Sequence, residues 1–422
     1  MIKRLLNIIC QLILASLSFS CYHHNNSRAN YDHIYYKPKY AKGFEIIGHR
    51  DSLSRIIRIK STWQGGDSTA MELFIARNGE LPPKDFDGFI IDSASRRLAP
   101  LSTTHIAMLD LINKEESIVA VSGGELSNNQ YIAESFSKTF NTKRIREVGN
   151  IETLNYEVLV ESRPDLVLIY GINSASIAEK KLESLGLPYL YIGEYLEEEP
   201  LGRSEWMVLM GELTGCIDFS IEKFSEIEDN YTEIKSNNEE LKRAGMSEKR
   251  PLVMLNAPFG DVWYMPSSSS AISKLIHDAG GQYIYKSRVE QSMQISLEEA
   301  YLLVSKADYW LDLGQIRTLS ALGRHYPHFL ETDCVKNSRV YNPDKIVNKM
   351  GGNDYWERGM IRPDIVLRDL KIIFSSFGAK KGVCNETVVR PETGMKTGAD
   401  IGADIGADIG AEADLVFFRR VE

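Results

Sequence analysis

Two arginines lie beside aromatic residues in the sequence, and their guanidinium groups could hold a bulky anion. Arg203 lies in "PLGRSEW", and Arg317 follows the apolar run "DYWLDLG". A guanidinium pairs with carboxylates in a fork and stacks on planar groups, so this combination suits a flat or bulky anionic chelate. The candidate aromatic partners are Tyr170, Tyr195, Trp263 and Tyr264. Each of these rings could equally well pack inside its own domain.

Most of these residues follow predicted strands. In parallel α/β sheets, ligands bind outside the carboxyl ends of the strands. The same rule adds a polar stretch in the first half of the chain to the candidate ligand-binding residues: Ser102, Thr103, Thr104 and His105.

Other kinds of chemistry have weaker support. His325 and His328 in "RHYPHF" have a spacing that metal ligands can have, but a bare transition-metal site needs further converging ligands. We therefore predict no resident metal or cofactor, although His105 could reach haem iron. The sequence contains no GxSxG, HExxH or Walker motif, so we expect a binding protein rather than an enzyme.

A phrase consisting of an acid, a helix and an apolar strand occurs twice. "NYEVLVESRPDLVLIYG" spans 155–171, and "SLEEAYLLVSKADYWLDLG" spans 296–314. Glu157 stands near the start of the first copy. Glu298 is our choice for the second copy, with Glu299 as its close rival. Both acids could also simply face solvent.

Strands alternate with helices on both sides of one long helical stretch. This alternation indicates an α/β protein with mostly parallel sheets. Between the two halves, residues 220–243 contain no Gly or Pro and place apolar residues at three- to four-residue steps, which predicts a single amphipathic helix. The predicted strands before it are 55–60, 71–77, 89–92, 117–122, 165–171 and 188–193; those after it include 251–256, 262–266, 338–342 and the end of the chain.

The N-terminus has the pattern of an export signal. Lys3 and Arg4 precede an apolar run that is too short for a comfortable membrane span, and small residues lead to Cys21. Cys21 resembles a lipobox cysteine, whose lipid would anchor the protein to a membrane. Without residues 1–20 the chain has 47 basic and 58 acidic residues, a net charge of −11 that argues against nucleic-acid binding.

Several longer stretches together resemble a known family. They include "STTHIAMLDLI" (102–112), "EYLEEEPLGRSEW" (194–206), "WYMPSSSSAISKLIHDAGGQYIY" (263–285) and "GGNDYWERGMIRPDIVLRDL" (351–370). The chain is similar to the substrate-binding lipoproteins of ABC transporters that import ferric siderophores, haem and cobalamin. The resemblance covers roughly residues 50–378 and the final strand.

This resemblance implies two Rossmann-like α/β lobes joined by one long α-helix, with the ligand cleft between the lobes. We expect a signal peptide at 1–20, a tether at 21–43, lobes at 44–219 and 246–422, and the connecting helix at 220–245. It also implies that Glu157 and Glu298 dock onto an ABC permease and its ATPase, and that the protein is a lipid-anchored monomer of the periplasm or cell envelope.

The identity of the chelate stays open at this stage. Arg203 and Arg317 favour an anionic iron chelate, either a ferric siderophore or haem, whereas an aromatic cleft would suit the corrin of cobalamin equally well. The low-complexity insertion at 379–413, which includes the repeat "GADIGADIGADIGA", is predicted to be a solvated loop and has no functional interpretation.

Overall fold

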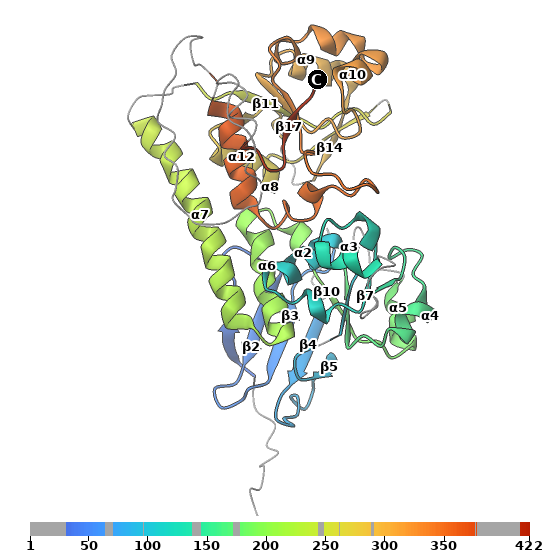
Figure 1. The fold of residues 1–422 in the computed structure, drawn as a ribbon. Helices are drawn as coiled ribbons and strands as arrows, with labels where there is room; N and C mark the ends of the chain where they lie inside the picture. Colours follow the sequence, from blue (N-terminus) through green and yellow to red (C-terminus); the bar gives the residue numbers. More distant parts are fainter. Residues whose placement is uncertain are drawn as a thin grey trace, which may run out of the picture.

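The structure is a computed structural model that describes residues 31–63, 71–95, 97–136, 145–171, 178–243, 249–260, 262–287, 291–375, 377 and 414–422, with side chains of α7 described as far as residue 236. Two α/β lobes are connected by the long helix α7, which runs along one side of the molecule (Figure 1). The predicted signal peptide, Cys21 and the insertion at 379–413 lie outside the described residues.

The first five strands form a sheet of their own in the order β1-β2-β3-β4-β5. Its strands are β1 (His33–Tyr36), β2 (Phe44–Gly48), β3 (Arg55–Ile59), β4 (Met71–Ala76) and β5 (Phe89–Asp92). All pairings are antiparallel except β4 with β5. The prediction of parallel βαβ units is therefore wrong for this region. Its connections are too short for most crossovers, whereas antiparallel neighbours need only a turn.

A parallel sheet forms the rest of the N-terminal lobe. Its strands are β6 (Leu98–Pro100), β9 (Leu166–Ile169) and β10 (Tyr189–Tyr191), in the order β10-β9-β6, and the short pair β7 (Ala120–Val121) and β8 (Arg146–Glu147) lies beside them. The connecting helices are α2 (Thr103–Leu111), η1 (Glu115–Ser117), η2 (Gly124–Leu126), α3 (Gln130–Phe136), α4 (Tyr156–Glu161), α5 (Ala178–Ser184) and η3 (Glu194–Leu196).

Two helices connect this lobe to the next. The first, α6 (Pro200–Thr214), is almost wholly buried and ends at Gly215, whose left-handed backbone (φ 75°) suits glycine. The second, α7 (Ile217–Arg243), begins three residues before the predicted start and is about 40 Å long. It packs against α6 and the C-terminal helix α12 (Pro363–Ser375) and buries Phe224, Ile227 and Tyr231. α7 is therefore a continuous helix that contacts elements of both lobes.

The C-terminal lobe contains a five-stranded sheet in the order β13-β11-β15-β16-β17, parallel except for the last strand. Its strands are β11 (Leu252–Leu255), β13 (Gln282–Tyr283), β15 (Tyr309–Leu311), β16 (Val340–Asn342) and β17 (Arg419–Arg420), and a separate antiparallel pair is formed by β12 (Val262–Met265) and β14 (Met293–Ser296). The remaining helices are α8 (Ala271–Asp278), α9 (Leu297–Val304), α10 (Leu319–His325), η4 (Pro327–Glu331), α11 (Asp333–Lys336) and η5 (Asp354–Trp356).

Candidate functional site

In the N-terminal lobe, a buried polar cluster lies where β6 and β10 end. Ser102 caps α2, and its hydroxyl lies 2.8 Å from that of Thr104. Thr104 donates in turn to the Glu194 carboxylate, and Nε2 of the fully buried His105 lies 3.7 Å from the same carboxylate. Burial acts to raise the pKa of Glu194, but hydrogen bonds and charge interaction with His105 and Thr104 outweigh it and lower that pKa.

This cluster divides the predicted polar stretch into two parts. Thr104 and His105 are buried and position Glu194, so in this structure they present no surface to a ligand. Ser102 and Thr103 keep partly exposed side chains at the start of the helix. Only these two therefore remain placed for direct contact with a solute.

Arg203 lies between the two lobes without a carboxylate partner. Its Nε donates to the Glu197 carbonyl oxygen (3.1 Å) and its Nη2 to the Tyr195 carbonyl oxygen (3.4 Å), while Nη1 lies 3.8 Å from Sδ of Met360 in the other lobe. No salt bridge among the described residues includes Arg203. Burial lowers the pKa of its guanidinium, although nearby Tyr355, Glu194 and Glu197 oppose that shift. Arginine nevertheless stays charged, so a cation faces the inter-lobe region.

Other aromatic and acidic groups lie in segments that follow the strands of both lobes. Tyr195 is partly buried, and among the described residues its hydroxyl has no hydrogen-bond partner. Tyr170 is partly buried after β9. From the opposite lobe come Tyr355 and Asp312, and burial raises the pKa of both side chains. Tyr355 and Asp312 were missed in the sequence, although Tyr355 lies inside the quoted "GGNDYWERG" stretch.

The predicted residues of the C-terminal lobe are not all at the surface. Trp263 is fully buried, stacks on Trp310 (centroids 5.5 Å apart) and donates its indole N–H to the Leu255 carbonyl (2.9 Å). It therefore belongs to the core and has no surface to offer a ligand. Successive strand residues point to opposite faces, so Tyr264 is 42% exposed, and its hydroxyl accepts a hydrogen bond from Gln294 (3.0 Å).

Arg317 has a different environment from Arg203. It is exposed, and its Nε lies 3.6 Å from Oδ2 of Asp344. Arg419 pairs with the same carboxylate more closely, at 2.7 Å. The structure thus places Arg317 in a surface ion-pair group, whereas Arg203 is partly buried.

One side of the lobe interface is closed by direct contacts. Glu357 accepts hydrogen bonds from the Ser127 hydroxyl and the Asn128 backbone N–H (2.6 Å), and Asn348 donates to the Ser127 carbonyl (3.0 Å). A methyl group added to Gly352 would lie 1.8 Å from the carbonyl oxygen of Leu126, so only glycine permits this approach. A pocket of about 300 Å³ remains beside these contacts, between α2 and the loop that follows β16.

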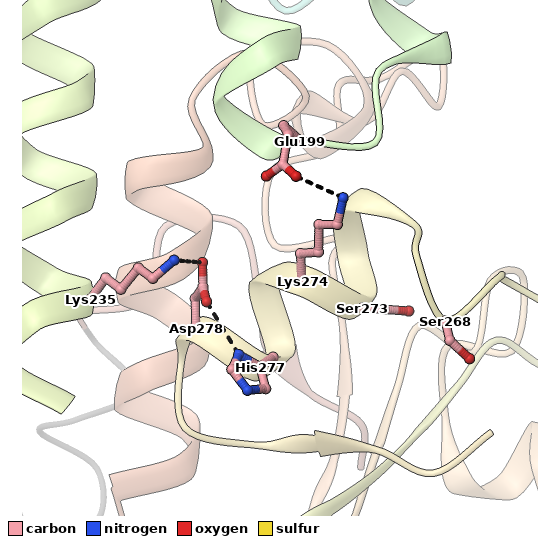
Figure 2. Close-up of a pocket in the computed structure, with 7 residues that line it drawn as sticks. All are labelled: Glu199, Lys235, Ser268, Ser273, Lys274, His277 and Asp278. Carbon is pink, nitrogen blue, oxygen red and sulfur yellow. Dashed lines mark hydrogen bonds and ion pairs between the residues drawn. The ribbon is translucent and has the colours of Figure 1, made fainter. Parts of the chain in front are cut away.

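A second pocket, of about 260 Å³, lies beside α7 and is lined by paired charges. Lys274 reaches Glu199 (2.8 Å), and both Lys235 (3.0 Å) and His277 (3.3 Å) reach Asp278 (Figure 2). Because each charged group already has a partner, this pocket is a seam that attaches α8 to α7 and to the N-terminal lobe.

Comparison with known proteins identifies the family. A family model described as periplasmic binding protein matches residues 98–346. The chain belongs to the periplasmic binding protein family.

Two lipoproteins of Methanocaldococcus jannaschii, both described as uncharacterized, are relatives of this periplasmic binding protein. One is 25% identical over 356 residues, covering 79% of this chain and 81% of its own. The other is 22% identical over 320 residues, covering 73% and 78%. A solved periplasmic binding protein from Veillonella parvula has 12% identity and a TM-score of 0.51, and the match covers 73% of this chain and 95% of that one. The predicted class of two α/β lobes joined by one long helix is confirmed.

The two acids predicted to dock this periplasmic binding protein occupy the same helical position. Asn155 caps α4 by accepting from the Val158 N–H (3.1 Å), and Ser296 caps α9 by accepting from the Glu299 N–H (3.2 Å). Glu157 and Glu298 are each the second residue of their helix, and both are exposed. The rival Glu299 is the third residue of α9 and is also exposed. Hydrogen bonds from its own backbone and from Ser296 lower the pKa of Glu298.

Neither a metal site nor a membrane span is found in the part of the chain that the structure describes. No three His, Cys, Asp or Glu side chains there come together as metal ligands, and His325 and His328 are both exposed. None of the helices in the described ranges combines the length and the apolar character needed to cross a bilayer.

Proposed function

We propose that this chain is a lipid-anchored, extracytoplasmic binding protein that captures an iron chelate, either a ferric siderophore or haem, and delivers it to an ABC import permease. The family supports solute binding outside the cytoplasm. The observation that carries the choice of ligand is the partly buried Arg203, which faces the other lobe and has no ion-pair partner among the described residues.

A chelate with a net negative charge, such as haem with its carboxylates or a ferric tris-catecholate, would provide the missing counter-charge. Arg203 is partly buried, and the present acceptors of its guanidinium are two carbonyl oxygens and a sulfur atom. A charge-assisted bond to an anion is about twice as strong as a neutral hydrogen bond, so the ligand should gain strongly from this contact. Tyr195 and Tyr170 are partly buried aromatic side chains, and the buried Tyr195 hydroxyl has no acceptor among the described residues.

Absorbance titration tests the ligand directly. Purified protein is titrated with ferric enterobactin, haemin and cyanocobalamin, and with ferrioxamine B as a cationic control. We expect tight binding of at least one of the two anionic iron chelates and weaker binding of ferrioxamine B. Arg203→Gln should weaken that binding about 10- to 100-fold, by analogy with the loss of a charged hydrogen bond. Arg317→Gln is the matched control and should change it less. Tight binding of cyanocobalamin with none of the iron chelates would replace this proposal with a corrinoid-binding protein.

Delivery is tested separately from capture. Glu157→Arg combined with Glu298→Arg should abolish uptake in cells while leaving the affinity for the chelate unchanged. Unchanged uptake would instead favour a scavenger or scaffold that works without an ABC partner. The anchor is tested by Cys21→Ser, which should release the protein from the membrane fraction.

A further inference from the structure

Each of the two helices that carry a docking acid also exposes an aliphatic side chain. On α4, Val160 lies three residues after Glu157 and is 42% exposed. On α9, Leu302 lies four residues after Glu298 and is 60% exposed. Residues three and four apart are neighbours on a helix surface, so each aliphatic group stands beside its acid.

The buried faces of these helices show that this exposure is not a consequence of poor packing. The fourth residue of each helix, Leu159 in α4 and Ala300 in α9, is fully buried against its lobe. Val160 and Leu302 are therefore turned away from well-packed cores. Single exposed apolar residues are common, but here they recur beside the same acid at the same kind of capped helix, once in each lobe.

The two helices lie at the periphery of their lobes. In Figure 1, α4 is at the edge of the N-terminal lobe farthest from α7, and α9 is on the outer part of the C-terminal lobe. The two acid-and-aliphatic pairs therefore form two contact points, one on each lobe. Glu161 on α4 already pairs with Arg146 (3.2 Å), but Glu299 adds a further exposed acid beside Glu298. The exposed acids at 157, 298 and 299 favour a basic partner surface.

We propose that Val160 and Leu302 are the apolar half of a two-point docking surface, in which each acid-and-aliphatic pair fits one of two permease subunits that presents a basic side chain beside an apolar recess. This inference rests on the proposed delivery to an ABC permease. Exposed ion pairs add little affinity and mainly speed and orient the encounter. The aliphatic contacts lower the dissociation rate of the complex.

The acids and the aliphatic residues should affect different rate constants of the complex. Glu298→Gln should slow association and reduce its dependence on ionic strength. Leu302→Ser should speed dissociation about 10-fold and leave the salt dependence unchanged, and Val160→Ser should have a smaller effect in the same direction. Truncation of a side chain at the centre of a contact acts mostly on the dissociation rate.

The test is photo-crosslinking of the full-length lipoprotein in its own cells, with benzoylphenylalanine placed at 157, 160, 298 or 302. Positions 53 and 221 are matched controls, because Leu53 is 55% exposed and Ile221 on α7 is 36% exposed, and neither lies on α4 or α9. We expect crosslinks from 160 and 302 to the membrane subunits of an ABC transporter, identified by mass spectrometry, and none from 53 or 221. The yield from 298 should fall in the Leu302→Ser background and persist at high salt.

The possible failures can be told apart. Permease crosslinks from 157 and 298 but none from 160 and 302 would overturn this inference and leave the delivery function intact. The same inference fails if Leu302→Ser behaves like Leu53→Ser in the crosslinking yield from 298. An absence of ABC subunits among the crosslinks from all four positions would remove the proposed delivery itself.

Discussion

The two lobes each hold one described end of the chain on a buried carboxylate. The carboxylate lies 164–166 residues from the segment that it holds in the N-terminal lobe and 47–49 residues from it in the C-terminal lobe. In the N-terminal lobe, Glu205 of α6 accepts from the backbone N–H groups of Lys39, Tyr40 and Ala41 (2.7–2.8 Å). In the C-terminal lobe, Asp369 of α12 accepts from those of Val416, Phe417 and Phe418 (2.7–3.4 Å). Both helices pack against α7.

The two segments also differ in whether an insertion lies next to them. The segment at Lys39–Ala41 leads into β2 three residues later. The segment at Val416–Phe418 leads into β17, but residues 378–413 come between it and α12. The entropic cost of closing a loop grows only slowly with loop length. A carboxylate that accepts from three backbone N–H groups can therefore hold the last strand in place despite the insertion. The comparison explains how this lobe accommodates a low-complexity insertion.

Removal of either carboxylate should have the largest effect on stability. In Glu205→Ala and in Asp369→Ala three backbone N–H groups lose their acceptor, and a buried donor left unsatisfied costs about 1–3 kcal/mol. We expect each variant to lose about 3 kcal/mol or more of unfolding free energy, measured by urea denaturation. Glu226→Ala, at an exposed pair with Lys223, is the control and should lose less than about 0.5 kcal/mol.

Hydrogen exchange sharpens the same comparison. Asp369→Ala should deprotect the amides of 416–418 and leave 39–41 protected, and Glu205→Ala should do the reverse. Equal deprotection of both segments in either variant would show that the two anchors are one cooperative unit.

The sequence predicted the elements better than their contacts. The apolar period of 220–243 was sufficient for α7, and the run at 251–256 for β11, because both signals are local. Successive residues of the strand "VWYM" point to opposite faces, so only one of Trp263 and Tyr264 can face outward. Trp263 is the buried one. Arg203, by contrast, acquires its environment from Met360 and Tyr355, more than 150 residues away. No sequence pattern reports that kind of pairing.

The contact between the lobes provides the next largest effect. In Gly352→Ala the new methyl group would overlap the Leu126 backbone carbonyl, which has no flexible side chain to move aside. We expect a loss of about 1–3 kcal/mol and a wider separation of the lobes, measured by urea denaturation and by double electron–electron resonance between labels on α3 and η5. Gly193→Ala, whose methyl group would lie no closer than 3.4 Å to other atoms, should leave the label distance unchanged.

The Glu357 carboxylate in the same contact predicts a smaller, pH-dependent effect. Burial raises the pKa of Glu357 above its ordinary value of 4.5, although hydrogen bonds from Asn128 and Ser127 oppose the shift. Between 4.5 and the raised value the folded protein binds the proton more tightly than the unfolded chain, so this contribution to stability falls as pH rises. Glu357→Gln removes the titration. The unfolding free energy of Glu357→Gln minus that of the native protein should therefore increase from pH 4.5 to pH 7, measured by urea denaturation. A difference that stays constant or decreases over this range would contradict the prediction.

The smallest effect is expected from the insertion itself. Deletion of residues 398–405, two units of the "GADI" repeat, would shorten the stretch between α12 and the captured segment, residues 376–415, from 40 to 32 residues. The loop-closure relation gives a gain of only about 0.2 kcal/mol, because the cost depends on the logarithm of length. Urea denaturation should therefore show no loss of stability, and Asp369→Ala should cost the same with or without the deletion. A destabilised deletion variant would mean that the insertion contributes contacts of its own, and the C-terminal lobe would then depend on more than its carboxylate anchor.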